Sequence, residues 1–131
     1  MTNNTKEQII RASDEREARS LVERKACAIV VLNHTRIKHD TLRALDTIIT
    51  PVIARLAAKQ GITFGIDIGE LRALPSHAQA RELARIQRAI EICRKARAGM
   101  AVLHASDERA ARTFLLALGA STQQAAHAQV L

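Results

Sequence analysis

The chain has 131 residues, which fits one domain over residues 1–131 and lets about two thirds of the unfolded chain's surface become buried. It carries 20 basic and 13 acidic residues, and the formal net charge of +7 favours a polyanionic partner. Tryptophan and tyrosine are absent, and Phe64 and Phe114 are the only aromatic residues. This composition argues against a protein that reads unpaired bases by stacking on aromatic rings.

No apolar run approaches the length of a transmembrane helix, and the polar start Met1–Gln8 lacks the apolar segment of a signal peptide. Cys27 and Cys93 lie within apolar patterns, so both are expected to be buried and reduced. The sequence therefore predicts a soluble cytoplasmic protein that makes no contact with a membrane.

Strand and helix patterns alternate along the chain. Strands are marked by apolar runs or strict alternation, and helices by a cap residue before them and a glycine after them. In chain order, the sequence predicts strand Glu7–Ala12, helix Asp14–Arg24 capped by Ser13, strand Cys27–Leu32, helix Pro51–Gln60 between Thr50 and Gly61, strand Ile62–Ile68, helix Ser76–Arg97 stopped by Gly99, strand Met100–His104, helix Asp107–Leu118 capped by Ser106 and stopped by Gly119, and a last short helix capped by Ser121 and Gln124.

Repeated strand–helix units predict an α/β fold with a mostly parallel sheet of about four strands, joined by right-handed crossovers. Two architectures remain open at this point. One is a small, open, doubly wound sheet, and the other is part of a (β/α)8 barrel, of which this chain has half the strands. Gly65 and Gly69 are the only glycines not explained as helix stops, so no glycine-rich phosphate loop is expected.

The predicted helix Ser76–Arg97 has two faces of opposite chemistry. Ser76 and Gln79 fit a capping box at its start. Apolar side chains recur at spacings of three and four, and a row of cations falls roughly opposite them. This row fits either a phosphate backbone or an ordinary solvated face. The apolar stripe is Leu83, Ile86, Ile90 and Cys93, and the cation row is Arg81, Arg85, Arg88 and Lys95.

The order of these motifs resembles the TIM-barrel protein subunit of archaeal and eukaryotic ribonuclease P, also called protein component three. The resemblance covers Ile9–Val130 and corresponds to the C-terminal part of the family barrel. It therefore implies half of a barrel of the polymerase-and-histidinol-phosphatase type, truncated at its start. The matching segments are Leu45–Ala57 (LDTIITPVIARLA), Gly61–Ile66 (GITFGI), the helix with Arg81, Leu83, Ile90, Arg94 and Lys95, the strand Met100–Leu103 (MAVL), and Leu115–Gly119.

This resemblance implies a non-catalytic protein that assists a catalytic RNA in cutting the 5′ leader from precursor tRNA. It also implies a ferredoxin-like protein partner in a heterotetramer, and Mg²⁺ that belongs to the RNA, with no cofactor bound by this chain. Arg36 and Lys38, in a polar loop, and Arg109, at a strand end, are candidate phosphate contacts beside the helical cation row. Two exposed sheet edges are expected to be covered by a partner subunit or a second copy.

Two other functions stay open. A metal-dependent phosphoesterase would need His34, His39, Asp67 and His104 to converge, but no His-x-His pair stands at a strand end, so no metal site is predicted. A structural interaction domain without an RNA role is the third reading. No catalytic residue is predicted, because Cys93 lies on an apolar helix face and no Ser-His-Asp signature is present.

Overall fold

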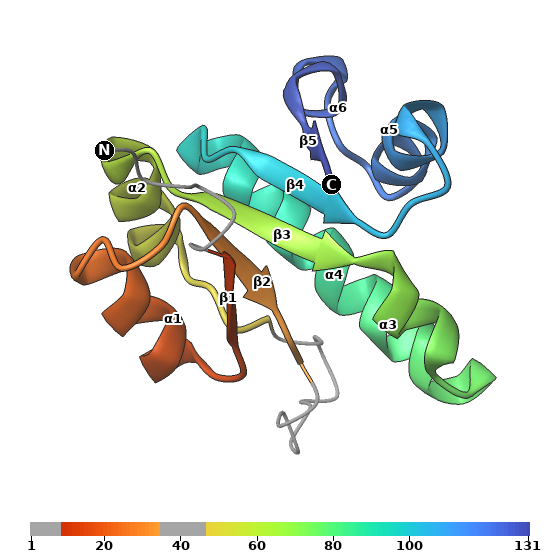
Figure 1. Cartoon of the computed structure of the whole chain (residues 1–131), viewed down its shortest axis with the longest axis horizontal. Helices are drawn as coiled ribbons and strands as arrows, with labels where there is room; N and C mark the ends of the chain where they lie inside the picture. Colours follow the sequence, from red (N-terminus) through yellow and green to blue (C-terminus); the bar gives the residue numbers. More distant parts are fainter. Residues whose placement is uncertain (1–8, 35–46) are drawn as a thin grey trace.

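The computed structural model describes residues 9–34 and 47–131, and in them a five-stranded sheet and six helices (Figure 1). All four strand pairings are parallel, and the strands lie in chain order, β1-β2-β3-β4-β5. The strands are β1 Ile9–Ala12, β2 Ile29–Leu32, β3 Thr63–Asp67, β4 Met100–Leu103 and β5 Gln129–Val130. The helices are α1 Glu15–Glu23, α2 Pro51–Gln60, α3 Ile68–Ala73, α4 Ser76–Ala96, α5 Glu108–Ala117 and α6 Thr122–His127.

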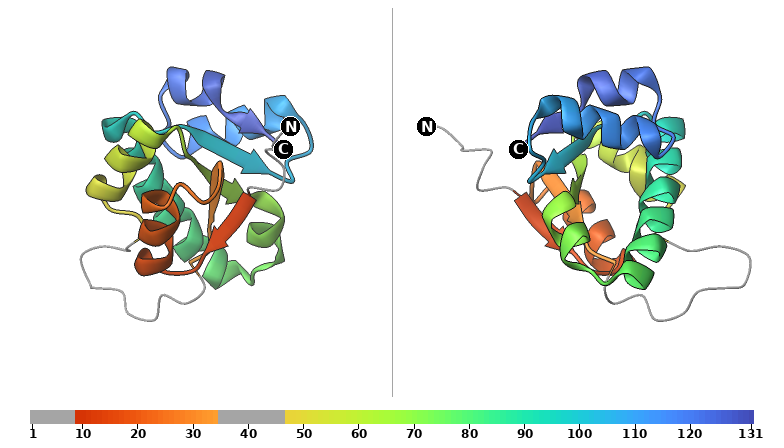
Figure 2. Two further views of the ribbon diagram at one scale, coloured as in Figure 1. Left: turned by 60° about the vertical axis from the view of Figure 1, so that its left-hand side comes forward. Right: turned by 90° about the vertical axis from the view of Figure 1, so that its right-hand side faces the viewer.

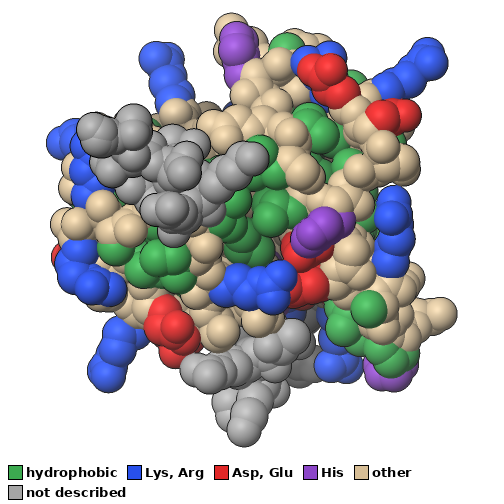
Figure 3. Space-filling model, viewed as in Figure 1, with side chains coloured by type: hydrophobic (Ala, Val, Ile, Leu, Met, Phe, Trp, Pro, Cys, Tyr) green, Lys and Arg blue, Asp and Glu red, His purple; other side chains and the backbone are tan. Residues whose placement is uncertain are grey.

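The helices pack against one face of the sheet. Right-handed crossovers between strands in chain order place every connecting helix on the same side, and α2 packs against both α1 and α4 (Figure 2). Alternate strand residues, among them Val30, Phe64 and Val102, belong to the large core that includes the helices. The opposite face carries a small cluster of strand residues, Ile29, Val31 and Ala101, without a described helix residue. Hydrophobic side chains accordingly lie in the middle of the face shown in Figure 3.

This architecture confirms an α/β fold with a parallel sheet of βα units. A doubly wound sheet reverses its strand order and covers both faces with helices. In this chain the strand order does not reverse, and the core that includes the helices lies on one face of the sheet. The predicted number of about four strands was too low, because β5 was not expected. None of the helices in the described residues has both the length and the apolar composition needed to span a membrane.

Several helix boundaries follow the predicted caps. The Thr50 hydroxyl accepts a hydrogen bond from the backbone N–H of Ile53 at 3.2 Å, and Pro51 begins α2. Gly61, at φ 72°, ends that helix in the left-handed conformation that glycine adopts without steric cost. Ser121 and Gln124 form the predicted capping box of α6. Each of these caps forms between residues only a few positions apart, which is why the sequence predicts them.

Other caps were predicted wrongly by one residue. Asp14 and Asp107 cap α1 and α5 in place of the preceding serines, and their carboxylates accept backbone N–H groups at 2.8 and 2.7 Å. A charged acceptor at a helix start is favoured by the helix dipole. At α4, Pro75 is the N-cap and no side chain caps the helix. The Gln79 amide instead donates to the carbonyl of Leu74 at 2.9 Å, so the predicted capping box does not form.

Two helix–strand boundaries also differ from the prediction. The third strand ends at Asp67, because the Asp67 carboxylate accepts the N–H of Glu70 at 3.2 Å and starts α3. Helix α4 ends one residue earlier than predicted, and Arg97 holds its left-handed C-cap position at φ 61°. Gly99 therefore does not act as the helix stop.

Candidate functional site

Charged side chains from the ends of β1, β3 and β4 meet at the carboxyl edge of the sheet. Arg11 comes from β1, Asp67 ends β3, and His104 follows β4 directly. Arg11 Nη2 lies 3.0 Å from Asp67 Oδ2, and His104 Nδ1 lies 2.8 Å from Asp67 Oδ1. The guanidinium of Arg11 also contacts the carboxylate of Glu70 on α3. This cluster lies at the sheet edge where parallel α/β proteins place their functional groups.

Asp67 is the centre of the cluster, and its side chain is only 3% exposed. Burial by itself raises the pKa of the Asp67 carboxyl, but the hydrogen bond and charge of His104 and the backbone N–H groups of Glu70 and Gly69 outweigh it, so the pKa is lowered. A Cβ at Gly69 would lie 3.1 Å from Asp67 Oδ1 and 3.4 Å from the His104 Cβ. The sequence Asp-Ile-Gly therefore lets the carboxylate and the imidazole approach each other closely.

The His104 imidazole is held beside Asp67 by the hydrogen bond at Nδ1. Its backbone is left-handed at φ 64°, and its side chain is 66% exposed. Because a carboxylate only accepts, Nδ1–H donates to Asp67, and Nε2 is the ring nitrogen that remains to contact a ligand. The ion pairs of Arg11 with Asp67 and Glu70 were not predicted, because Arg11 is far from both residues along the chain.

The lowered pKa of Asp67 predicts a specific acid sensitivity. A carboxylate whose folded-state pKa is depressed stabilises the fold above its unfolded pKa of about 3.9, and that stability is lost as pH falls through the folded pKa. Urea unfolding between pH 6 and about 2.5 should therefore show a steeper loss of stability for the wild type than for Asp67→Asn. Parallel pH curves for the two proteins would contradict this account of Asp67.

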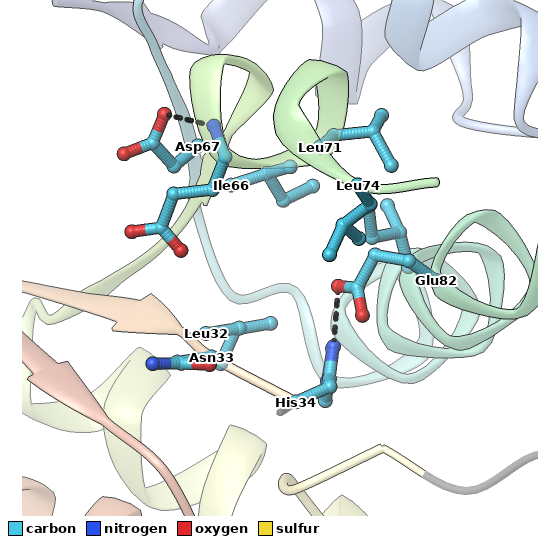
Figure 4. Close-up of a pocket in the computed structure, with 10 residues that line it drawn as sticks. Leu32, Asn33, His34, Ile66, Asp67, Leu71, Leu74 and Glu82 are labelled. Carbon is cyan, nitrogen blue, oxygen red and sulfur yellow. Dashed lines mark hydrogen bonds and ion pairs between the residues drawn. The ribbon is translucent and has the colours of Figure 1, made fainter. Parts of the chain in front are cut away.

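A second polar group lies in a small cavity of about 40 Å³ near the ends of β2 and β3 (Figure 4). The His34 side chain is fully buried there, with Nδ1 2.7 Å from Glu82 Oε2 and Nε2 2.7 Å from Thr47 Oγ1. A carboxylate only accepts, so Nδ1–H donates to Glu82, and Nε2 shares its hydrogen bond with the Thr47 hydroxyl. Both ring nitrogens are thus occupied, and the cavity holds no more than a few waters. His34 links β2 to α4 and is a structural residue.

The four candidate metal ligands do not all meet. Asp67 and His104 are in contact, whereas His34 is bound to Glu82 and Thr47. His39 lies outside the described residues. Among residues 9–34 and 47–131, no group of three His, Cys, Asp or Glu side chains has a geometry that could hold a metal ion.

The predicted cation row on α4 is only partly exposed. Arg81, Arg88 and Lys95 are exposed, but Arg85 is only 5% exposed, so its prediction as an outward cation is wrong. Helix α4 packs on α2 as well as on the sheet. Ala89 and Ile92, which follow Arg85 on the same flank, are buried with it. The prediction assumed a single buried stripe and therefore placed Arg85 in solvent.

The exposed part of the row borders a groove between α2 and α4. Arg55 of α2 joins Arg88 and Lys95 around this groove of about 140 Å³, with Ile92 in its wall. Arg88 also pairs with Glu91 on its own helix. Arg55 was missed as a functional candidate because sequence alone does not show which helices pack side by side.

The remaining predicted RNA contacts have separate positions. Arg109 is exposed in the first turn of α5, at the carboxyl edge of the sheet. Arg36 and Lys38 lie outside the described residues. The structure thus brings no predicted loop cation together with the α4 row in the residues it describes.

Both cysteines are buried and free, as predicted. Burial raises the pKa of the Cys93 thiol to about 12. Burial also raises the pKa of Cys27, although the charge of Arg24 opposes it. A thiolate is the reactive form, so neither residue is a nucleophile near neutral pH.

No protein-family model matches this chain, and no curated protein matches its sequence.

Proposed function

We propose that this chain is a non-catalytic protein subunit of ribonuclease P, which supports the catalytic RNA in removing the 5′ leader from precursor tRNA. The observation that carries the proposal is the strand order β1-β2-β3-β4-β5, parallel throughout and with the connecting helices on one face. That is the winding expected for the C-terminal half of the family barrel. The order of the Thr50–Pro51 helix, the Arg-rich helix and the apolar strand β4 agrees with it.

The charge distribution supports a positioning role rather than catalysis. Arg81, Arg88, Lys95 and Arg109 are exposed cations that can contact phosphates. Within the described residues, the hydrogen-bond partners of the Asp67–His104 pair include no serine or cysteine. The chemistry of cleavage, with its Mg²⁺, is therefore assigned to the RNA.

The sheet edges support the need for a partner. β1 and the two-residue β5 are the outer strands, and a parallel sheet with free edges tends to recruit another chain. We propose that a ferredoxin-like subunit in a heterotetramer, or a second copy of this chain, covers an edge. Light scattering on the purified chain tests this, and a soluble monomer that binds no such subunit would refute it.

Charge reversal on α4 should weaken assembly with the RNA. The variant Arg81→Glu/Arg88→Glu changes two exposed cations and should reduce the salt dependence of binding to the cognate RNA by about two units of log–log slope. Arg85 is left unchanged because its side chain is buried. Arg19→Glu, at an exposed and ion-paired position on α1, is the control and should have a smaller effect. If the double variant bound RNA as the wild type does, the α4 cation row would be an ordinary solvated helix face with no part in RNA binding.

The RNA that accompanies the chain in its native cell tests the class of function. Affinity purification followed by RNA sequencing should recover one long structured RNA together with precursor tRNA. Recovery of no RNA, with stoichiometric zinc or manganese and phosphatase activity, would favour the phosphoesterase alternative. Salt-insensitive binding to a protein alone would favour the interaction domain.

A further inference from the structure

The acidic residues of this protein lie mostly at one end of its strands, whereas its cations lie at both ends. Parallel βα units run every crossover helix back toward the amino edge of the sheet, so the C-terminal ends of α1, α2 and α4 lie near the starts of β2, β3 and β4. Six exposed cations lie at these three helix ends, and we call them the amino-edge patch. The patch consists of Arg24, Lys25, Lys59, Arg94, Lys95 and Arg97.

The acidic residues are mostly at the opposite edge. Glu82, in the second turn of α4, lines the same cavity as Asp67. Seven more of the acidic side chains described are at helix starts or strand ends on the carboxyl side: Asp14, Glu15, Glu17, Asp67, Glu70, Asp107 and Glu108. Glu23 and Glu91 are nearer to the amino-edge patch, but they pair with Arg19 and Arg88. Within the described residues, no ion pair with a carboxylate involves any of the six patch cations.

The three helix ends that carry the patch cations also lie next to one another. β2, β3 and β4 are adjacent in the sheet, so the loops that precede them are spread over about 10 Å in the direction of strand pairing. Arg94 and Arg97 border a groove of about 470 Å³, with His127 of α6 on its other side. Lys and Arg side chains gather along the left margin of Figure 3, where α1 and α2 lie in Figure 1.

Helix stability explains some of these cations but not all of them. Lys59, Arg94 and Lys95 lie in last helical turns, where a positive charge complements the helix dipole. Lys25 and Arg97 lie beyond the helices in the left-handed conformation, at φ 50° and 61°. Any residue with a Cβ is sterically disfavoured there, and α2 has Gly61 at its corresponding position. Two helix ends therefore carry a cation where glycine would fit better.

We infer that the amino-edge patch binds the phosphate backbone of structured RNA. The cations of the patch come from three helix ends. The large hydrophobic side chains that are exposed in the described residues are Val52, Leu116 and Leu131, and none of them lies at these helix ends. Protein interfaces rely on apolar or aromatic anchors, which the patch lacks. The choice of RNA as the polyanion rests on the proposed function. RNA bound to the patch lies at the amino edge of the sheet, whereas the Asp67–His104 cluster lies at the carboxyl edge.

The test compares two matched double variants of the full chain. Lys25→Gly/Arg97→Gly removes two patch cations at positions that favour glycine, and Arg16→Gln/Arg72→Gln removes two exposed cations near the carboxyl edge. Binding to an RNA duplex of about 20 base pairs is measured across salt concentrations, together with thermal unfolding. The patch variant should bind about 10-fold more weakly at low salt, with a log–log salt slope smaller by about two. Its unfolding midpoint should be equal to or above that of the wild type.

The patch assignment is overturned if both double variants lose the same slope, or if the patch variant binds the duplex as the wild type does. It is also overturned if the patch variant loses binding to phosphatidylserine vesicles but keeps its RNA affinity. A different result would refute the proposed function alone: ribonuclease P activity would not require the chain, although duplex binding by the chain still depended on the patch. If the chain is required but the patch variant binds the duplex normally and supports cleavage fully, only the patch assignment fails.

Discussion

Replacing Phe64 with alanine is expected to lower the free energy of unfolding by about 3–5 kcal/mol. Phe64 is the second residue of β3, the central strand, and its side chain is fully buried. It pairs in register with Val30 on one side and Met100 on the other, and all three are buried in the core. Removing the ring loses apolar burial and leaves a cavity that the strands cannot close.

Denaturant unfolding followed by circular dichroism measures this effect. Phe64→Leu is the matched control, because it keeps most of the apolar volume and should cost less than about 2 kcal/mol. A loss of less than about 1 kcal/mol for Phe64→Ala would mean that the core is not built around β3.

Asp67→Ala is expected to lower the free energy of unfolding by about 1.5–3 kcal/mol. The substitution removes the cap of α3, worth about 1 kcal/mol, and the charged hydrogen bonds from Arg11 and His104. Arg11 and His104 are 51% and 66% exposed, so water replaces part of what these hydrogen bonds contribute.

Two further variants separate these contributions. Asp67→Asn keeps an oxygen that can accept the N–H of Glu70, so it should be less destabilising than Asp67→Ala. Arg11→Gln removes only the partly exposed ion pair and should cost less than about 1 kcal/mol. Equal stability of all three variants would contradict the central position of Asp67 in the cluster.

The sequence predicts those elements whose signals are local. Thr50, Pro51 and Gly61 delimit α2 because each satisfies or avoids backbone hydrogen bonds within its own helix turn. The apolar run at β2 predicts a strand that is buried along its length, and all four of its residues are buried.

Features that depend on tertiary packing could not be predicted in this way. Arg85 has the spacing of an exposed residue with respect to the sheet, but it is buried, on the flank of α4 that also carries the buried Ala89 and Ile92. The alternation from Ile62 to Ile68 is the same whether the strand ends at Asp67 or one residue later, and the cap to Glu70 decides between them. β5 has two residues, which is too short for a periodic pattern to show.

In the candidate site, too, local features could be predicted from the sequence and long-range contacts could not. His104 and Asp67 were identified as strand-end residues, and strand order explains why they meet. The pairing of Arg11 with Asp67 spans 56 positions of sequence and depends on a strand that is two places away in the sheet. His34 was considered as a metal ligand, but Glu82 and Thr47 occupy both of its ring nitrogens.

Reconstitution of ribonuclease P from its RNA and protein subunits, with and without this chain, tests the proposed function most directly. Cleavage of the 5′ leader from precursor tRNA is measured at a fixed Mg²⁺ concentration, with the chain alone as a further sample. The proposal predicts no cleavage by the chain alone, and a faster reaction by the RNA when the chain is added with its ferredoxin-like partner. Cleavage at the same rate whether or not the chain is present would contradict the proposal.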